Sequence, residues 1–598
     1  MFEDWSTRHV AYARYGPMLA MQAAARDPRA GMSWWGALQA GENDSGPVDD
    51  AARLRGRGAW GRPRVHHDWA INLGTAGTAN GMYPAKFTFD VTATPSCAND
   101  YIIFPINASG SATQPNIVAL NNLYSGTAGA NGICNRTPSA SDTGVAATVL
   151  WSYNVQAISG GGAVTTSPVI AYDPLGGSVT GTTVAFVESA AGSPAHFHVL
   201  APKNGDGQNS GNLQSVLSPK TINTFVSNAP AAASGTSTDL SLGSSTSGTV
   251  TLSSPFVDYV RDLAYVGNDL GVLYRIKNVF CTSVNPNCSG GSKPAPSLDA
   301  SFGSGGSVTV CSGQLTGPVM DFVTLNIYVG CSDGKLYSLS QTGTVNGSLV
   351  VGDGVASKTY GAIVDPPIVD GVNGFVYVSS GSASNGANGV LVQANMALSS
   401  SVAVPIGAGN QCNLHAPALS NGYFTSPTGA NSLIYIGGAT GTVGPCTALG
   451  ATGGNLVIYG ATFKAGGVLN SGAPAHNFTA GNPGNEFAPM AEFYNANAGT
   501  GTDYLFFSAM CTGADMDALN ITTGWSTSFL VTPVVSGFGT SGMIVDNYAK
   551  TTAGNYPQAS SIYFNALGEN AACTGNTGTN TTPGANGCAV KLTQAALN

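Results

Sequence analysis

Two histidines, His196 and His198, stand two positions apart in an otherwise apolar segment. Alternate side chains of a β-strand point to the same face, so a strand here would place both imidazoles on one side. Two imidazoles on one face could chelate a metal ion. No carboxylate and no third histidine lies close to them in the sequence. We therefore favour packing within a strand, or a surface position, over a metal site.

Acidic residues form two further patterns. Asp515 and Asp517 are also two positions apart, close to Cys511, so a strand would place both on one face. The two carboxylates could bind a cation, but we favour a polar strand face. Four others hold equivalent places in the repeat described below, where a ring of carboxylates could bind a cation: Asp258, Asp321, Asp370 and Glu492. Aspartate also favours tight turns, and we prefer that interpretation.

The chain has 11 cysteines, and ten of them fall into pairs of neighbours along the sequence. The pairs are Cys97 with Cys134, Cys281 with Cys288, Cys311 with Cys331, Cys412 with Cys446, and Cys573 with Cys588. None has the spacing of a zinc site, so we predict structural disulfides and an extracellular, periplasmic or cell-surface location. Cys511 is left over, and it is either buried or links two molecules.

Motifs for nucleotide binding, serine hydrolysis or zinc proteolysis are absent from the sequence. The segments best placed to form a ligand site are rich in Gly, Ser, Thr, Asn and Ala: 105–115, 379–388, 437–454 and 565–587. An active site for sugar or acid–base chemistry would show paired carboxylates or histidines. We therefore predict no catalytic residue, no metal ligand and no bound cofactor.

A three-part repeat supplies the elements that would position these residues. Each copy begins with a small residue, a proline and an apolar run, which we call strand A: 83–89, 167–172, 254–259, 317–322, 366–370, 416–420, 488–492 and, without the proline, 541–545. Strand B is aromatic and β-branched: 101–104, 184–187, 263–267, 326–330, 375–378, 433–437, 504–507 and 561–564. Strand C follows: 116–120, 196–200, 272–276, 335–339, 389–392, 455–459, 515–519 and 588–592.

Eight copies of a small sheet predict an all-β, eight-bladed β-propeller of four-stranded antiparallel blades. An outermost strand D is visible at 151–155, which contains Trp151. A matching run with Trp69 lies at 69–73, ahead of the first strand A, whereas the last copy ends soon after its strand C. We predict that 69–73 completes the last blade and closes the ring.

The sequence resembles the repeat of pyrroloquinoline-quinone-type, or quinoprotein-like, β-propellers most clearly in two copies, 254–276 and 317–339. The resemblance of the overall architecture extends over residues 67–598. The chain also looks like secreted bacterial propellers of unassigned role. Quinone-dependent dehydrogenases of this fold hold their cofactor between a tryptophan and a disulfide of adjacent cysteines. This sequence has no adjacent cysteines, and we place Trp69, Trp151 and Trp525 on outer D strands. The resemblance therefore implies the propeller fold. The missing cysteine pair and the outer positions of the tryptophans argue against a quinone site.

Residues 1–66 differ from the rest, because they contain nine arginines and no lysine. This tail is either a disordered basic arm, a targeting segment or the product of a misassigned start, and we favour the last. The propeller is expected to occupy 67–598.

The amino-acid composition argues against two classes of function. Net charge is −9 with only 22 Lys and Arg, which argues against a nucleic-acid binder, and no apolar run is long enough to span a membrane. We expect a secreted or surface-displayed propeller that acts as a binding, scaffold or self-assembling module, with a protein partner or a second copy. The alternative is a quinone-dependent oxidoreductase, or a metal-dependent hydrolase or lyase, with its site on the B–C loop face.

Overall fold

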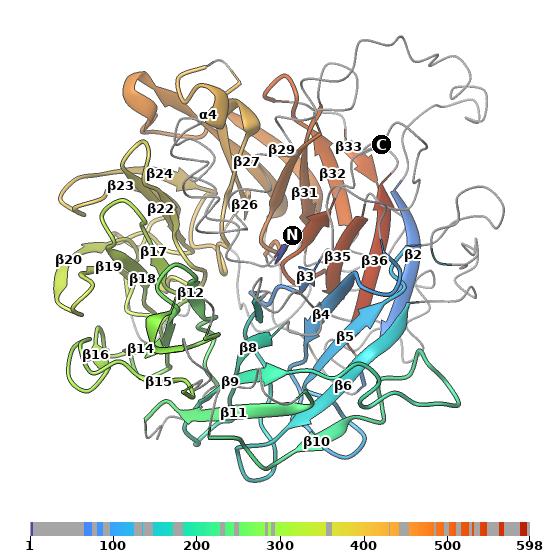
Figure 1. Cartoon of the computed structure of the whole chain (residues 1–598). Helices are drawn as coiled ribbons and strands as arrows, with labels where there is room; N and C mark the ends of the chain where they lie inside the picture. The colour runs from blue at the N-terminus through green and yellow to red at the C-terminus, as the bar shows by residue number, and fades with distance from the viewer. Residues whose placement is uncertain are drawn as a thin grey trace, which may run out of the picture.

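Eight small sheets follow one another around a ring in the computed structural model, with strand A of each sheet nearest the centre and strand D at the rim (Figure 1). The structure describes residues 2–3, 65–74, 81–87, 96–124, 134, 147–171, 183–227, 234–243, 250–281, 285–288, 294–354, 361–429, 431–441, 454–483, 486–495, 502–509, 516–525, 529–531, 539–546, 561–566 and 587–594. The predicted eight-bladed β-propeller is confirmed.

The first four blades run from the centre to the rim as follows. Blade 1 contains β3 (Ala85–Phe87), β4 (Tyr101–Pro105), β5 (Ile117–Asn121) and β6 (Thr148–Val155), with β1 (Phe2–Glu3) added inside and β10 (Lys220–Ile222) outside. Blade 2 contains β7 (Val169–Ala171), β8 (Thr183–Glu188), β9 (His196–Ala201) and β11 (Thr236–Ser241). Blade 3 contains β12 (Phe256–Asp258), β13 (Leu263–Gly267), β14 (Val272–Lys277) and a divided outer strand, β15 (Ser297–Leu298) and β16 (Ser307–Thr309). Blade 4 contains β17 (Val319–Met320), β18 (Ile327–Gly330), β19 (Lys335–Leu339) and β20 (Val345–Val350).

The last four blades repeat this order. Blade 5 contains β21 (Ile368–Asp370), β22 (Phe375–Ser380), β23 (Gly389–Asn395) and β24 (Ser401–Ile406). Blade 6 contains β25 (Ala418–Leu419), β26 (Leu433–Ala439), β27 (Asn455–Lys464), β28 (Val468–Leu469) and β29 (His476–Pro483). Blade 7 contains β30 (Ala491–Asn495), β31 (Thr502–Ser508), β32 (Met516–Asn520) and β33 (Phe529–Val531). Blade 8 contains β34 (Ile544–Asp546), β35 (Ser561–Ala566), β36 (Cys588–Gln594) and β2 (Val65–Asn72). Helical turns are short: η6 (Pro286–Cys288), α4 (Asn421–Thr425) and η8 (Ala465–Gly467).

The ring closes as the sequence predicts. Strand β2, from the N-terminal side of the propeller, pairs antiparallel with β36 near the C-terminus and forms the outer strand of blade 8. The register of this pair shifts between His67 and Trp69, so that Asp68 is an extra residue in β2. Such a β-bulge redirects a side chain. Strand β2 starts at Val65, two residues before the predicted start of the propeller.

Blade 1 departs from the predicted four-stranded plan. The excursion between β9 and β11 runs back along the outer edge of β6, where β10 pairs with β6 in parallel. Its backbone also bonds to β6 through Ser152 N–H to Asp206 O and Val149 N–H to Leu213 O, each 2.9 Å long. This excursion therefore covers an outer edge that would otherwise stay unpaired.

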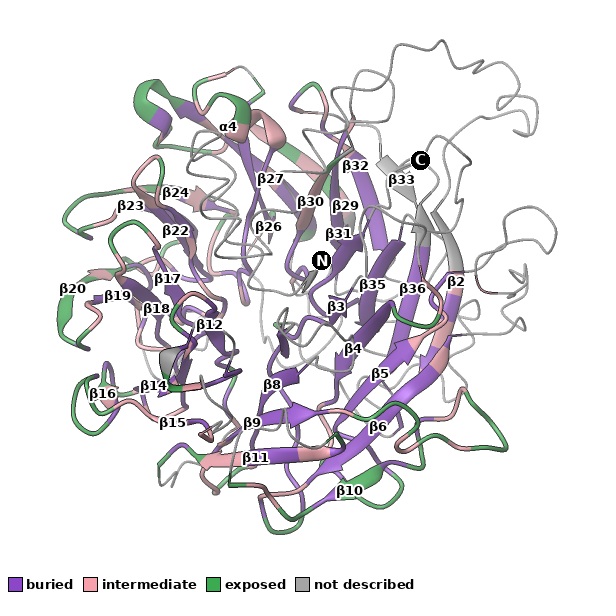
Figure 2. Cartoon of the chain, in the orientation of Figure 1, coloured by how far each residue is buried: buried purple, intermediate pink, exposed green. Residues whose placement is uncertain are grey.

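The core lies between neighbouring blades, because the inner strands are buried on both faces (Figure 2). Tyr153 and Ile103 of blade 1 belong to one cluster with Phe186 of blade 2, and Phe506 of blade 7 packs in another with Phe564 of blade 8. This explains why strands A, B and C are continuous apolar runs instead of alternating ones. Among the described residues, no helix is long and apolar enough to span a bilayer.

Glycine is required at the B–C turns of the two most regular blades. Gly271 and Gly334 have φ of 78° and 81°, a region that disfavours residues with a Cβ. A Cβ at Gly271 would also lie 2.1 Å from the carbonyl oxygen of Cys311. These turns let strands B and C pair closely in blades 3 and 4.

Candidate functional site

The loops that join strand D of one blade to strand A of the next meet near the centre of the ring. In the first blades they are tied together by hydroxyl groups that precede the strand A prolines. The Tyr83 N–H donates to Ser167 Oγ, and the Ser167 N–H donates to Ser254 Oγ, both at 2.9 Å. The Ser253 hydroxyl donates to the carbonyl oxygen of Thr316 at 2.8 Å. Ser167 and Ser254, each directly before a strand A proline, therefore make contacts between blades.

In blades 5 to 7 the D–A loops carry charged groups instead. Asp365 precedes β21, His415 precedes β25 and Glu486 precedes β30. The Nδ1 atom of His415 lies 3.0 Å from Oδ1 of Asp365, and its Nε2 atom lies 3.8 Å from Oε1 of Glu486. The Ala416 N–H donates to the other oxygen of Asp365 at 2.7 Å. One imidazole thus connects the D–A loops of three consecutive blades.

This cluster, Asp365–His415–Glu486, lies where loops meet across the centre of the ring. A Cβ on Gly81, in the loop that leads into blade 1, would lie 3.5 Å from Oδ1 of Asp365. Asp365 and His415 are both buried. The loops before blade 1 and blade 5 therefore approach each other over the central strands.

The electrostatics of the cluster favour the imidazolium form. Burial alone would lower the pKa of His415, but the carboxylates of Asp365 and Glu486 outweigh burial and raise the pKa to about 10. His415 is therefore protonated at neutral pH, and it cannot accept a proton as a general base there. The arrangement can hold three loops in place, and it can bury an ion pair that shields both charges.

Sequence analysis did not find this cluster, because its members are far apart in the chain and precede strands in loops of different length. The only local signal is that Asp365 stands directly before a strand A proline and His415 stands two residues before one.

His196 and His198 do share one side of β9, with ring centres 6.3 Å apart. Each has an internal partner. His196 Nδ1 lies 2.7 Å from Asp239 Oδ1, and His198 Nε2 lies 3.1 Å from Glu188 Oε2. His198 Nδ1 also lies 3.0 Å from the carbonyl oxygen of Thr238, so both nitrogens of this buried ring face acceptors.

Glu188 is the residue that sequence analysis missed here. Its carboxylate accepts the N–H groups of Ala157, Ile158 and Gly162 at 2.8 to 3.3 Å in addition to facing His198. Asp239, the partner of His196, would have its pKa raised by burial. The hydrogen bond and positive charge of the histidines more than offset this and lower it. His196 and His198 therefore pack as part of the sheet, which is the interpretation favoured from the sequence.

The repeated aspartates cap their own A–B turns. Asp258 accepts the N–H groups of Val260 and Arg261, and Asp370 accepts those of Val372 and Asn373, at 3.0 to 3.2 Å. Asp321 makes the same bonds to Val323 and Thr324 at 3.3 and 2.8 Å. The turn interpretation holds for these three residues.

Glu492, the fourth member, differs. It is partly buried, and its Oε1 atom is shielded from solvent, near the buried Asp503 at the start of β31. Burial and the negative charge of Asp503 raise the pKa of Glu492 well above its ordinary value. Asp503 in turn accepts the N–H of Asn421, the first residue of α4, at 2.9 Å. The two carboxyls therefore lie in a site that links blade 7 to α4 of blade 6.

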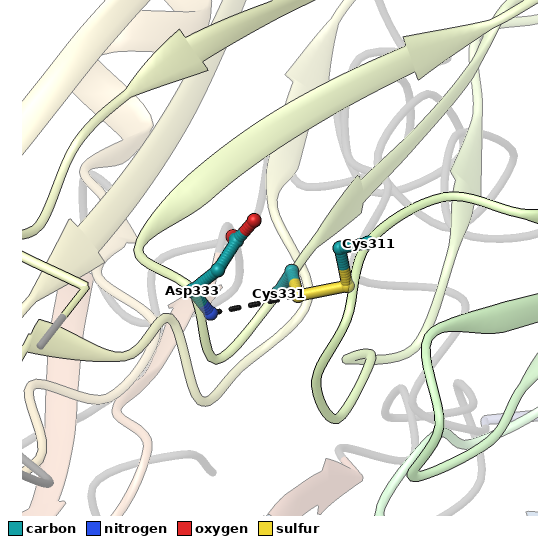
Figure 3. Close-up of side chains that lie close together, drawn as sticks. All are labelled: Cys311, Cys331 and Asp333. Carbon is teal, nitrogen blue, oxygen red and sulfur yellow. Dashed lines mark hydrogen bonds between the residues drawn. A yellow bond between two sulfur atoms is a disulfide. The ribbon is translucent and has the colours of Figure 1, made fainter. Parts of the chain in front are cut away.

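The structure contains the disulfides Cys97–Cys134, Cys281–Cys288 and Cys311–Cys331. Figure 3 shows Cys311, Cys331 and Asp333, the one group of potential metal ligands found among the described residues. Its two sulfur atoms are bonded to each other, and the Asp333 N–H donates to the sulfur of Cys331 at 3.5 Å. The group is therefore a disulfide with a capped turn and not a metal centre in this oxidised state.

Other sequence-based predictions fall partly outside the described residues. Cys412 and Cys588 are disulfide-bonded, whereas their predicted partners Cys446 and Cys573 and the unpaired Cys511 lie outside the described residues. The same is true of Asp515 and of most of the B–C loops at 437–454 and 565–587, while Asp517 is a buried residue of β32.

The prediction for Trp525 was wrong. Trp69 lies in β2 and Trp151 in β6, both outer strands as expected. Trp525 precedes the outer strand β33, and its ring stacks on His476 of blade 6 with ring centres 5.1 Å apart. The Trp525 ring thus packs against blade 6, because it also stacks on Tyr435 with ring centres 6.1 Å apart.

No family model and no curated protein matches the chain. Solved structures with a similar arrangement include BamB from Moraxella catarrhalis, which has 12% identity over 88% of this chain and 97% of that chain at a TM-score of 0.36. Sqt1 from Saccharomyces cerevisiae has 10% identity, covers 89% and 99%, and gives a TM-score of 0.42. A quinohemoprotein alcohol dehydrogenase from Pseudomonas putida HK5 has 15% identity over 47% of this chain and 42% of its own, with a TM-score of 0.26. These likenesses concern the propeller fold alone.

Proposed function

We propose that this chain is a secreted or surface-displayed β-propeller that acts as a binding or scaffold module, and that its loop face contacts another protein or a second copy. The observation that carries the proposal is the internal pairing of the Asp365–His415–Glu486 cluster. Its histidine is cationic at neutral pH and faces a carboxylate at each ring nitrogen. These side chains hold the D–A loops in place instead of offering a free acid or base to a substrate.

Two further features support the proposal. Several disulfides, three of them between described cysteines, are typical of a protein that works in a non-reducing compartment. The B–C loop of blade 5 exposes small, uncharged residues such as Ser384, Asn385 and Ala387. A rigid surface with few charges suits protein contacts more than electrostatic capture of a charged ligand.

A pair of matched surface variants tests the proposal. Asn385→Arg places a charge on the loop face, and Val323→Arg places the same charge on the A–B face, where Val323 is 56% exposed. Light scattering and chemical cross-linking of the protein from its source would report its assembly. We expect Asn385→Arg to weaken the assembly by about tenfold or more, equivalent to about 1.4 kcal/mol, and Val323→Arg to leave it unchanged. A wild-type protein that stays monomeric without any bound protein would contradict the proposal.

A further inference from the structure

Two buried lysine–aspartate pairs lie where the ring closes, between blades 8 and 1. Lys591 of β36 donates a hydrogen bond to Asp68 of β2. Lys86 of β3 in blade 1 lies 2.6 Å from Asp546 of β34 in blade 8. Both lysine side chains are fully buried, and those of Asp68 and Asp546 are 1% and 9% exposed.

The β-bulge in β2 brings Asp68 to Lys591. Lys591 pairs in register with Trp69 on one side and with Tyr563 on the other. Asp68 is the extra residue between His67 and Trp69, where the register of β2 against β36 shifts. The bulge directs its carboxylate to the Nζ atom of Lys591, and the two residues are 523 positions apart in the sequence.

The surroundings are aromatic and exclude water. The Nζ atoms of Lys86 and Lys591 each lie 5.7 Å from the ring centre of Tyr124. The rings of Trp69 and Tyr563 are 6.3 Å apart, and all three aromatic residues are buried. Removing an ammonium and a carboxylate from water to such a site carries a large desolvation penalty for both ions.

A third carboxylate belongs to the same cluster. The Tyr124 hydroxyl donates to Asp100 at 2.8 Å. Burial, together with the negative charges of Asp546, Asp68 and Asp100, raises the pKa of the Tyr563 hydroxyl. Among the described residues, the ammonium groups of Lys86 and Lys591 therefore share this site with the carboxyl groups of Asp68, Asp546 and Asp100.

We propose that Lys591 and Asp68 form an intramolecular isopeptide bond that closes the propeller covalently. The geometry that supports the proposal is a hydrogen-bonded amine and carboxyl, both buried, held in place by a bulge and two paired strands. Fixed proximity of this kind replaces a collision in solution by an intramolecular step.

The reaction is a condensation that needs no oxidant and no cofactor. Nζ of Lys591 first passes one proton to the Asp68 carboxylate, which gives a neutral amine and a carboxylic acid. The amine then attacks Cγ of Asp68, an N–C bond forms, and the bond from Cγ to the hydroxyl oxygen breaks. A second proton from nitrogen joins the departing hydroxyl, which leaves as water. One ammonium and one carboxylate become one neutral amide and one water, so the charges balance. In water, ionisation of the separate groups favours hydrolysis, but burial penalises both ions and favours the amide.

The bond would lie in blade 8, where the propeller ring closes. Blade 8 is assembled from the two ends of the propeller, and hydrogen bonds between β2 and β36 hold these ends together. An amide between Lys591 and Asp68 would keep blade 8 intact when those hydrogen bonds open. Lys86 and Asp546, which belong to blades 1 and 8, would remain an ion pair.

Mass spectrometry of the recombinant full chain after reduction and denaturation tests the proposal directly. We expect a mass about 18 Da below that of the unmodified chain, and a branched peptide that joins the segments around Asp68 and Lys591 after digestion. Lys591→Arg keeps the positive charge but cannot form the amide, so its mass should match its sequence. Lys86→Arg is the matched control and should retain the loss.

Two results would overturn the proposal. One is a wild-type chain with no loss of water and no branched peptide, which would leave Lys591 and Asp68 as an ordinary ion pair. The other is a loss of water that persists in Lys591→Arg, which would place the bond elsewhere. The wild-type measurement stands alone if the variant does not fold.

Discussion

The backbone N–H of Ser167 donates to the hydroxyl of Ser254 at 2.9 Å, although the two residues belong to consecutive blades. Each residue directly precedes the proline that begins strand A of its blade. Tyr83 stands at the same position in blade 1 and donates to Ser167. The small residue before the proline therefore registers one blade against the next.

Ser254→Ala should destabilise the propeller by about 1–3 kcal/mol, because it leaves the buried N–H of Ser167 without its acceptor. Urea unfolding followed by tryptophan fluorescence would measure the change. Ser400→Ala, at an exposed position, is the control and should change stability by no more than about 0.5 kcal/mol. Equal effects of the two substitutions would show that the contact between blades is unimportant.

His415→Gln should destabilise the protein by about 3 kcal/mol near pH 6, because Asp365 and Glu486 lose a buried cation. The pKa of His415 is about 10 in the folded protein against an ordinary value of 6.5, so the folded state binds the proton more tightly. The stabilisation is complete below pH 6.5 and disappears as the pH rises through 10. Unfolding free energies of wild type and variant should therefore converge between pH 6.5 and 10. A constant difference over this range would contradict the ion-pair account.

Glu492→Gln should stabilise the protein at pH 7 by about 1 kcal/mol or more, because the amide cannot ionise next to Asp503. Burial and Asp503 raise the pKa of Glu492 above 4.5, so in wild type the folded state binds the proton more tightly. The contribution of Glu492 to the free energy of unfolding of the wild type is therefore most favourable at acid pH. It declines as the pH rises above 4.5. The extra stability of Glu492→Gln over wild type should therefore decrease toward pH 4, and thermal unfolding at several pH values would measure this. A loss of stability at every pH would mean that ionisation of Glu492 beside Asp503 does not destabilise the folded state.

Replacing both Cys311 and Cys331 by serine should destabilise the protein by about 3 kcal/mol, because their disulfide spans 20 residues and restricts the unfolded chain. Guanidinium unfolding without reductant compares the variant with wild type. No change in the unfolding midpoint would show that this disulfide contributes little to the stability of blades 3 and 4.

Much of the fold could be predicted from the sequence, because its signals are local. Each strand A, B and C lies at a predicted segment, and the match between Trp69 and Trp151 identified the closing strand correctly. The aspartates of the A–B turns follow from turn chemistry in the same way. These features need only neighbouring residues for their explanation.

The polar clusters could not be predicted so directly. Glu188 reaches His198 because β8 and β9 form a hairpin in which Glu188 pairs with His196, so knowledge of the register would have found it. Asp365 and His415 are 50 residues apart and meet only because the whole of blade 5 folds between them. The parallel strand β10 arises from a long excursion whose composition gives no strand signal.

The proposed function is that this propeller binds another protein or a second copy through its loop face. Native mass spectrometry of the protein isolated from its source, with and without reductant and with metal analysis, tests it most directly. We predict an assembly with another protein or with a second copy, free of stoichiometric metal and quinone. A monomer that carries one quinone or one metal ion per chain would contradict the account and would make the loop face an active site.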